Sequence, residues 1–231
     1  MDISNWIAHR ADWSGDRIAV RFEGREITYA EMEDRVGRLA GALRDDLGVG
    51  EGDRVAHLGL NSPELLELLF ACARIGAIAV PLNWRLTPEE HAFMIRDCGP
   101  AALLVEPEYH AHAAELAARF PALRMVAYGS PAAPLSSGDW LSYESITGGA
   151  TAVRPDPKRD LRTPVKIVYT SGTTGAPKGA VLSQEAIFYN AVNGMAVFEM
   201  TAADHILTAL PMFHVGGMNI QTTPAIHAGA T

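Results

Sequence analysis

A cluster of hydroxyls and glycines that precedes one lysine is the part of this sequence best suited to chemistry. It comprises Thr170, Ser171, Gly172, Thr173, Thr174, Gly175 and Lys178. Glycines allow backbone N–H groups to approach an anion closely, hydroxyls add rotatable donors, and the lysine adds a full positive charge. Short apolar runs flank the cluster on both sides. The pattern therefore predicts a phosphate-binding loop between two strands.

Two other interpretations of the cluster fit less well. A simple hairpin turn needs only about two to five residues and gains nothing from clustered hydroxyls. A Walker-type loop requires a lysine directly after its last glycine and a Ser or Thr directly after that lysine. Here Lys178 stands three positions after Gly175 and is followed by Gly179. The spacing excludes a P-loop ATPase or kinase.

The run from Tyr169 to Gly179 resembles the signature loop of the adenylate-forming superfamily, which includes acyl-CoA synthetases, aryl-CoA ligases, luciferases and adenylation domains of peptide synthetases. Residues 52–55, 61–63, 76–83 and 211–214 are similar to further family segments in order and spacing. The resemblance implies an AMP-dependent acyl-CoA synthetase or ligase, of which this chain is the N-terminal portion. It also implies that residues 170–175 and Lys178 bind the β- and γ-phosphates of ATP.

A second candidate site follows the loop, at Phe213, His214, Val215, Gly216 and Gly217. A lone histidine after a strand is more often structural than catalytic. The resemblance, however, places the matching family histidine beside the acyl-binding tunnel. We therefore expect this segment to bind the substrate, a small carboxylic acid, and expect Lys178 and His214 to be the catalytic residues. Amino-acid-activating relatives usually have an aspartate here, so a fatty or aryl acid is favoured.

The sequence also departs from the family pattern. Gln184 stands where many relatives have a histidine, so no role of that histidine transfers to this chain. The family's adenine and magnesium segment, ribose-binding aspartate, hinge and C-terminal domain with its catalytic lysine are not found. The resemblance implies ATP, Mg²⁺ and coenzyme A for a protein of roughly twice this length, with the Mg²⁺ and CoA sites mostly outside the chain and no metal ligands within it.

Three functional hypotheses follow from these features. The first is activation of a carboxylic acid to acyl-AMP and thioester formation with coenzyme A by the full-length protein, with the 231-residue chain itself inactive. The second is a stand-alone adenylation enzyme that loads a carrier protein. The third is a non-catalytic, phosphate-binding fragment.

The hydrophobic pattern predicts the elements that position these sites. A helix at 5–13, a hairpin at 18–29 and a helix capped by Thr28 and Glu31 come first. Strands are predicted at 55–60, 77–82, 101–105 and 124–128, with helices at 63–75, 88–97 and 107–120 between them. After the loop we expect a helix at 184–198 and a strand at 204–210. This alternation predicts an α/β fold of mostly parallel sheets flanked by helices.

The domain organisation is predicted from a change in composition. Residues 129–162 are rich in Pro, Gly and Ser and form a candidate boundary. We expect an N-terminal α/β lobe at 1–150 and the incomplete start of a second lobe, which carries the loop, at 151–231. In the family the two form the first part of the large N-terminal domain.

Composition limits the class of protein and its partners. Hydrophobic residues make up 48% of the chain and charged residues 20%, as in globular proteins. The net charge of −8 argues against nucleic acid as a partner. Cys72 and Cys98 have no disulfide or metal-site spacing, and neither a signal peptide nor a membrane-spanning run is evident. A cytoplasmic protein is expected, with a homodimer left open; Lys158 and Lys166 are given no role.

Overall fold

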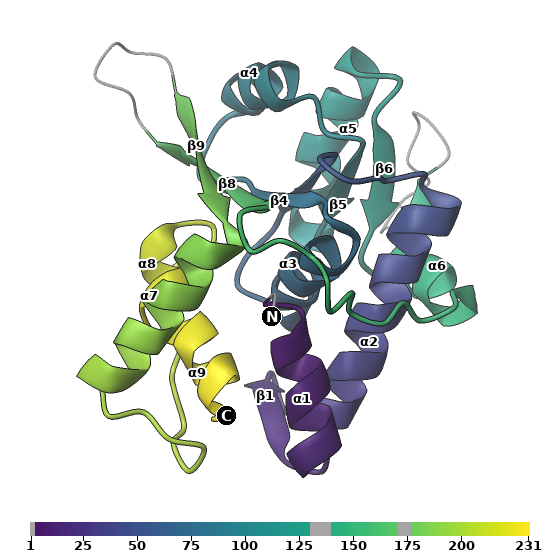
Figure 1. The fold of residues 1–231 in the computed structure, drawn as a ribbon. Helices are drawn as coiled ribbons and strands as arrows, with labels where there is room; N and C mark the ends of the chain where they lie inside the picture. The colour runs from purple at the N-terminus through teal and green to yellow at the C-terminus, as the bar shows by residue number, and fades with distance from the viewer. Residues whose placement is uncertain (1–2, 130–139, 171–176) are drawn as a thin grey trace.

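A seven-stranded sheet is the centre of the fold (Figure 1). The computed structural model describes residues 3–129, 140–170 and 177–231. The strands are β3 (Arg54–Leu58), β4 (Ile78–Pro81), β5 (Ala102–Val105), β6 (Arg124–Ala127), β7 (Leu141–Ser142), β8 (Pro164–Thr170) and β9 (Lys178–Ser183), in the order β7-β6-β5-β3-β4-β8-β9. Neighbouring strands are parallel except β8 and β9, which form an antiparallel hairpin. The predicted mostly parallel α/β fold is confirmed.

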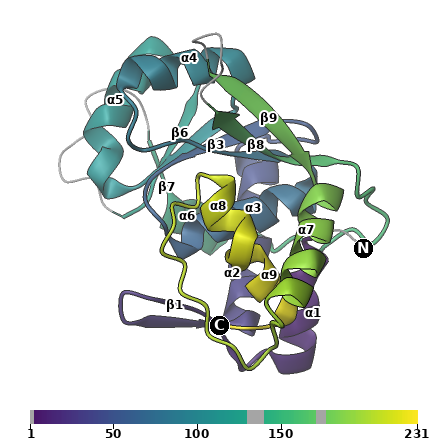
Figure 2. The ribbon, with the colours of Figure 1, turned by 90° about the vertical axis from the view of Figure 1, so that its left-hand side faces the viewer.

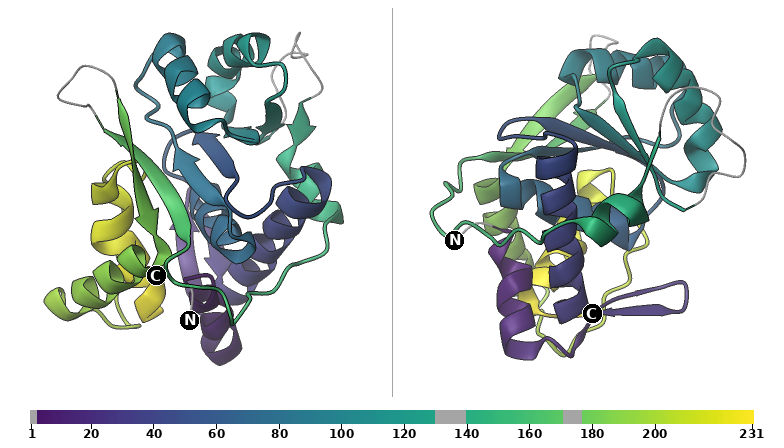
Figure 3. Two further views of the ribbon diagram at one scale, coloured as in Figure 1. Left: turned by 45° about the horizontal axis from the view of Figure 1, so that its top comes forward. Right: turned by 90° about the vertical axis from the view of Figure 1, so that its right-hand side faces the viewer.

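Helices cover both faces of this sheet (Figure 3). On one face lie α2 (Tyr29–Gly41) and α3 (Pro63–Ile75), and on the other lie α4 (Pro88–Cys98) and α5 (His110–Arg119). Successive strand residues point to opposite faces, so Val55 joins the core under α3 whereas Ala56 joins the core under α4. Both faces of the central strands are therefore buried.

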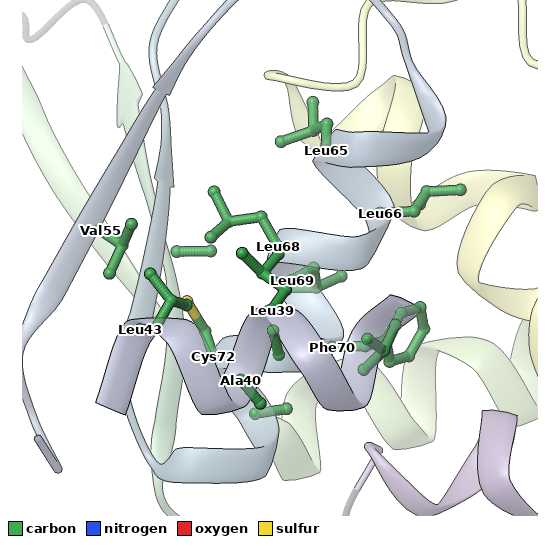
Figure 4. Packing of buried hydrophobic residues seen from close by; sticks show 14 of the residues in the cluster. Leu39, Ala40, Leu43, Val55, Leu65, Leu66, Leu68, Leu69, Phe70 and Cys72 are labelled. Atoms are coloured by element: carbon green, nitrogen blue, oxygen red, sulfur yellow. The ribbon is translucent and has the colours of Figure 1, made fainter. Parts of the chain in front are cut away.

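The α2–α3 interface contributes to the core on one face of the sheet (Figure 4). Leu39 of α2 lies beside Leu69 of α3, and Leu43 of the turn that follows α2 lies beside Cys72 of α3. All four side chains are fully buried. Full burial of such a side chain stabilises the fold by about 1.5–3 kcal/mol. The spacing of apolar residues in both helices thus determines how they pack.

The predicted helix ends are confirmed by their capping contacts. Thr28 and Glu31 form a reciprocal capping box at the start of α2, and Thr87 and Glu90 form another at the start of α4. Gly76 ends α3 with φ of 80°, a left-handed conformation that favours glycine. Local sequence signals therefore set these boundaries.

The N-terminal elements pack against the C-terminal ones (Figure 2). They are α1 (Asn5–Ser14), β1 (Ile18–Phe22) and β2 (Arg25–Thr28), and the C-terminal elements are α7 (Gln184–Val197), α8 (Val215–Gly217), the π-helical turn η3 (Met218–Thr222) and α9 (Thr223–Ala228). The rings of Trp6 and His227 lie 4.4 Å apart, and Tyr29 Oη donates to Ala230 O at 2.7 Å. Residues that are distant in sequence thus share one core.

The predicted strand at 204–210 is wrong, because this stretch is irregular. Its backbone pairs with one residue at the end of the chain: Thr231 N donates to Asp204 O at 3.0 Å and Ile206 N donates to Thr231 O at 2.8 Å. Leu207 is 85% exposed. Apolar alternation alone does not make a strand where no neighbouring strand among the described residues completes the ladder.

The stretch expected to form a boundary contains regular structure in its described part. Both β7 and α6 (Tyr143–Gly149) lie within residues 129–162. Earlier in the chain, the turn η1 (Ala42–Asp46) continues α2, and the turn η2 (Pro107–Tyr109) leads into α5. Val153 N donates to Gly37 O at 2.9 Å, so the chain runs along α2 before it enters β8. Because β8 pairs with β4, residues on both sides of position 150 belong to one sheet. The division into two lobes stays a prediction.

Candidate active site

The β8–β9 hairpin positions the predicted phosphate loop. Thr170 and Lys178 are paired residues at the open end of the hairpin, and Thr170 Oγ1 donates to Lys178 O at 3.5 Å. Both residues are exposed. Among the described residues the Lys178 ammonium has neither a hydrogen bond nor an ion pair, so its charge is available to an anion. Ser171, Gly172, Thr173, Thr174 and Gly175 lie outside the described residues.

The hairpin is held against α4 by the residue before Thr170. Tyr169 Oη donates to Asp97 Oδ2 at 2.7 Å, and its ring packs on the core between the sheet and α4. Directly opposite, Gly179 leaves room for this packing, since a Cβ there would lie 2.9 Å from Ile167 Cγ2 and 3.4 Å from the Tyr169 ring. The open end of the hairpin therefore has a defined base.

The second predicted segment forms a tight turn into α8. Gly217 is buried, and a Cβ there would lie only 2.2 Å from Pro211 O, so this position requires glycine. Thr222 Oγ1 donates to Gly217 O at 2.7 Å and closes the following π-helical turn. Such turns occur frequently at functional sites. Phe213 and Trp84 meet edge to face with ring centroids 6.5 Å apart.

His214 is the N-cap residue of α8 and has a defined ring orientation. Its Nδ1 accepts a hydrogen bond from Gly216 N at 3.0 Å, and the residue is exposed, as is Val215. A nitrogen that accepts cannot carry the proton, so in the neutral ring the proton lies on Nε2. His214 can therefore offer an N–H donor to a bound ligand.

Asn61 fixes the backbone that leads to His214. Its Nδ2 donates to Leu210 O at 2.9 Å and to Thr208 O at 3.3 Å, while its Oδ1 accepts from Met212 N at 2.8 Å. One amide side chain thus satisfies three backbone groups of an irregular segment. Sequence reasoning treated 61–63 as a family-like segment without a specific role, and the structure supplies one.

Lys166 is the residue that sequence reasoning missed. It was given no role, yet it is fully buried on β8, and its Nζ donates to Asn219 Oδ1 of η3 at 3.4 Å. Burial lowers the pKa of the Lys166 amine to about 7. The sequence feature that could have indicated a role for Lys166 is its position inside an apolar run that forms a strand. This pair connects the strand that leads to the phosphate loop with the turn that follows His214.

Gln184 has a structural position at the start of α7. It is fully buried, its Oε1 accepts from Ile3 N at 3.0 Å, and its Nε2 donates to Ala73 O at 3.4 Å. These contacts connect the N-terminus, α3 and α7. The substitution of the family histidine by glutamine is therefore accommodated by a satisfied hydrogen-bond network.

The β8–β9 hairpin and the segment at 213–217 belong to the same packed part of the fold, but Lys178 and His214 do not contact each other. In Figures 1 and 2, α8 lies on the side of the sheet where α3 and α7 pack. Lys178 is at the open end of the hairpin, and His214 is connected to β8 through η3.

Within residues 3–129, 140–170 and 177–231 there is no group of three His, Cys, Asp or Glu side chains placed to hold a metal ion. In the same residues no helix is long and apolar enough to cross a membrane.

Sequence comparison identifies the family. The AMP-binding enzyme family matches residues 7–231, and the chain belongs to this family. It is 47% identical over its whole length to the indoleacetate–CoA ligase of Aromatoleum aromaticum and 37% identical over 99% of its length to a feruloyl-CoA synthase of Amycolatopsis. It covers 44% and 43% of these two proteins, so it spans less than half the length of the relatives it matches.

Comparison of folds agrees with the sequence. A solved anthranilate CoA ligase in complex with anthranoyl-AMP superposes over the whole chain with a TM-score of 0.91, at 24% identity and over 44% of its own chain. A protein described as a putative long-chain-fatty-acid CoA ligase from Rhodopseudomonas palustris superposes with a TM-score of 0.88 at 29% identity, over the whole chain and 56% of its own. The predicted resemblance to AMP-dependent CoA ligases is confirmed.

Proposed function

We propose that the chain is part of a longer CoA ligase that activates a fatty or aryl carboxylic acid with ATP and transfers the acyl group to coenzyme A. The observation that carries this proposal is the Lys166–Asn219 contact, which joins the strand leading to the phosphate loop with the turn following His214. The predicted binding segments for the two reactants of the first step, ATP and the acid, thus belong to one packed unit. The relatives that are CoA ligases support the same reaction class.

In the first step, a carboxylate oxygen of the acid attacks the α-phosphorus of ATP. The bond between this phosphorus and the oxygen bridging to the β-phosphate breaks, so pyrophosphate leaves and acyl-AMP forms. Lys178, with its unpaired ammonium, would offset the charge on the departing pyrophosphate. An ionised carboxylate needs no general base, so His214 would act by orienting it through the Nε2 proton.

In the second step, the thiol of coenzyme A gives up its proton to solvent and its sulfur attacks the acyl carbon. The bond from that carbon to the AMP oxygen breaks, and AMP leaves. Activation is needed because a carboxylate is a poor electrophile. Mg²⁺, when bound, would neutralise negative charge on the phosphates of ATP. We propose that the Mg²⁺ site and most of the CoA site lie in the rest of the longer protein, outside this chain. We expect the 231-residue chain alone to be inactive.

Aryl acids are the favoured substrates within this proposal. The relatives include ligases named for indoleacetate and for ferulate. Phe213 and Trp84 meet edge to face at the predicted substrate segment, which would offer aromatic surface to an aromatic acid. Fatty acids stay in the proposal because relatives at 34–36% identity are named for them.

The test is ATP–pyrophosphate exchange by the full-length protein with aryl, fatty and amino acids. We expect exchange with aryl acids, loss of exchange in Lys178→Ala, and normal exchange in Lys158→Ala, where an equally exposed lysine lies outside the site. Exchange with amino acids alone would overturn the proposal. Robust thioester formation by the 231-residue chain would contradict the expected inactivity.

A carrier protein is the second candidate for the thiol acceptor. One relative, 36% identical over 92% of this chain, is a fatty acid–[acyl-carrier-protein] ligase from Streptomyces coeruleorubidus. Comparing coenzyme A with a phosphopantetheinylated carrier protein as acceptor distinguishes the two. We further propose a cytoplasmic location, which the two free cysteines support, and the absence of a nucleic-acid partner, which the acidic composition supports. A homodimer is a separate proposal.

A further inference from the structure

A group of buried polar side chains lies at the carboxyl ends of β3, β5 and β6, apart from the site described above. The group, which we call the switch-point cluster, consists of His57, Ser62, Glu106 and Tyr128. The connection after β3 leads over one face of the sheet to β4, whereas the connection after β5 leads over the other face to β6. The loops diverge here, and α/β sheets bind ligands at such points.

Strand register brings three of these side chains to the same face. Leu58 pairs with Val105 and Val105 with Ala127, so Glu106 and Tyr128 follow directly on neighbouring strands. By alternation His57, Glu106 and Tyr128 point toward α3, one layer beyond the apolar residues Val55, Leu104 and Val126. His57 and Tyr128 have ring centroids 5.7 Å apart.

Four polar atoms of the cluster are buried without a well-formed hydrogen bond among the described residues: His57 Nε2, Ser62 Oγ, Glu106 Oε1 and Tyr128 Oη. The Ser62 hydroxyl lies near enough to the Glu106 carboxyl to lower its pKa, so these two groups are less isolated than the other two. The residues His57, Ser62 and Tyr128 are 1%, 7% and 6% exposed. Ser62 occupies the N-cap position of α3 without capping it, so its hydroxyl is not used there. Buried polar groups in folded proteins are rarely left without a partner, so this cluster calls for a missing one.

Glu106 is held in place by its other oxygen. Leu60 N donates to Oε2 at 2.7 Å, and a Cβ on Gly59 would lie 2.3 Å from Cδ of Glu106, so glycine leaves the space that the carboxylate occupies. Oε1 lies 3.8 Å from His57 Nε2, too far for a hydrogen bond. One carboxylate oxygen is thus fixed and the other is free toward the cluster.

The charge balance decides what kind of partner fits. Burial lowers the pKa of His57 to about 3, so this ring is neutral and does not balance Glu106. Burial raises the pKa of the Glu106 carboxyl, the contacts with Leu60 N and the Ser62 hydroxyl lower it, and the nearby Glu64 and Glu108 raise it further, so no positive charge balances the ionised form. Arg35 is already paired with Glu64 and Glu67. The N-terminus of α3 supplies only about half a positive charge. Hydrogen-bond counting would admit a water molecule, but the unbalanced carboxylate favours a cation.

We propose that the switch-point cluster binds a monovalent cation of the size of ammonium or potassium, held by Glu106 Oε1, His57 Nε2 and the hydroxyls of Ser62 and Tyr128. All four atoms can present lone pairs to such an ion. The bound cation orders the loop at 59–62, whose Asn61 holds the backbone leading to His214. This proposal does not depend on the proposed ligase function, because it concerns binding by the chain itself.

The first test is thermal unfolding of the 231-residue chain in ammonium, potassium, sodium and choline chloride at equal ionic strength. A ligand of the folded state raises Tm saturably, so we expect a rise with ammonium or potassium over choline. Glu106→Gln should abolish the difference between salts. Glu115→Gln, which changes an exposed carboxylate on α5, should retain it.

Two further measurements test the proposal if the Glu106→Gln variant does not fold. Tyr128→Phe removes one oxygen only and should raise the cation concentration at half-saturation. Crystals soaked in thallium(I), which resembles potassium and scatters anomalously, should show a peak beside Glu106 Oε1. Equal Tm in all salts, a cation effect that Glu106→Gln retains, or a water molecule alone at the cluster in ammonium-soaked crystals would each overturn the proposal.

Discussion

Helices α3 and α7 are both rich in apolar residues, but their surroundings differ. Twelve of the thirteen residues of α3 are buried, because α3 lies between the sheet, α2 and the C-terminal elements. Three of the fourteen residues of α7 are buried: Gln184, Ile187 and Ala191. Tyr189 and Val197 of α7 are 56% and 75% exposed. A similar composition thus gives a core helix in one place and a half-covered helix in the other.

The difference shows that an apolar helix face must be buried by another element, and that the pattern alone does not say whether that element is present. Exposed apolar residues continue beyond α7 at Leu207, Leu210 and Ile220. A monomeric protein rarely leaves many such residues together on its surface. If the chain is part of a longer ligase, as we propose, further chain would cover this face, and α7 would become as buried as α3.

The largest contrast should appear when equivalent truncations are made in the two helices. Leu68→Ala in α3 should lower the free energy of unfolding by about 3–5 kcal/mol, because it opens a cavity in a fully buried layer. Val197→Ala in α7 should change it by less than about 0.5 kcal/mol. Urea unfolding followed by circular dichroism measures both, and similar losses would contradict the comparison.

Removing one partner of a buried ion pair at α3 should also lower the free energy of unfolding strongly. Arg35 Nε donates to Glu67 Oε1 at 2.5 Å, and Tyr143 Oη donates to Glu67 Oε2 at 2.6 Å, with the Glu67 side chain 1% exposed. Burial raises the pKa of Glu67, and Arg35 opposes this effect. Arg35→Ala leaves that carboxylate buried without its cation and should cost about 3 kcal/mol.

Arg38→Ala is the matched control for Arg35→Ala. Arg38 pairs with Asp34 on the exposed side of the same helix, and such surface pairs contribute about 0–1 kcal/mol. Urea unfolding at neutral pH should separate the two variants clearly. Equal effects would show that Glu67 is protonated and independent of Arg35.

Lys166 provides a pH-dependent contrast with the exposed Lys158. The pKa of Lys166 is about 7 in the folded chain against the ordinary 10.5, so between these values the unfolded chain binds more protons. Stability should therefore rise with pH across this window, by at most about 1.4 kcal/mol per pH unit from this one group. Lys166→Met should remove the rise and stabilise the chain below the window.

Urea unfolding at about pH 6, 8 and 10 checks the slope. Lys158→Met, which alters an exposed lysine, should keep the wild-type pH dependence. A Lys166→Met variant whose stability still rises with pH as in the wild type would show that Lys166 is charged in the folded state or that other groups produce the effect.

Local signals in the sequence were sufficient for much of the fold. Pro63 and Gly76 mark the ends of α3, and Thr28 with Glu31 marks the start of α2, because these residues act through contacts within one turn of the chain. Strand alternation likewise gave the parallel units from β3 to β6. The phosphate-loop candidates could be named because their residue types and spacing carry the chemistry.

Features that depend on distant contacts could not be predicted. The stretch at 204–210 has strand-like alternation but lacks a neighbouring strand in the described structure. Lys166 forms a hydrogen bond with Asn219, 53 residues later in the chain, and Glu106 lies near His57 of the adjacent strand. Asn61 holds a segment about 150 residues away. No local pattern reports such pairs, so only the folded arrangement reveals them.

The smallest effect on stability should occur at the predicted phosphate site itself. Lys178 is exposed and unpaired among the described residues, so Lys178→Ala should change the free energy of unfolding by less than about 0.5 kcal/mol. Its effect on the proposed reaction should be large, because a lost contact to developing phosphate charge costs roughly 10²–10³ in kcat. Pyrophosphate exchange by the full-length protein, measured beside urea unfolding of the same variant, separates the two effects. An exchange rate within about twofold of wild type would remove Lys178 from the site, whereas a parallel loss of stability would show that it supports the hairpin instead. The expected separation of function from stability at Lys178 is the opposite of that at Leu68, where stability alone should change.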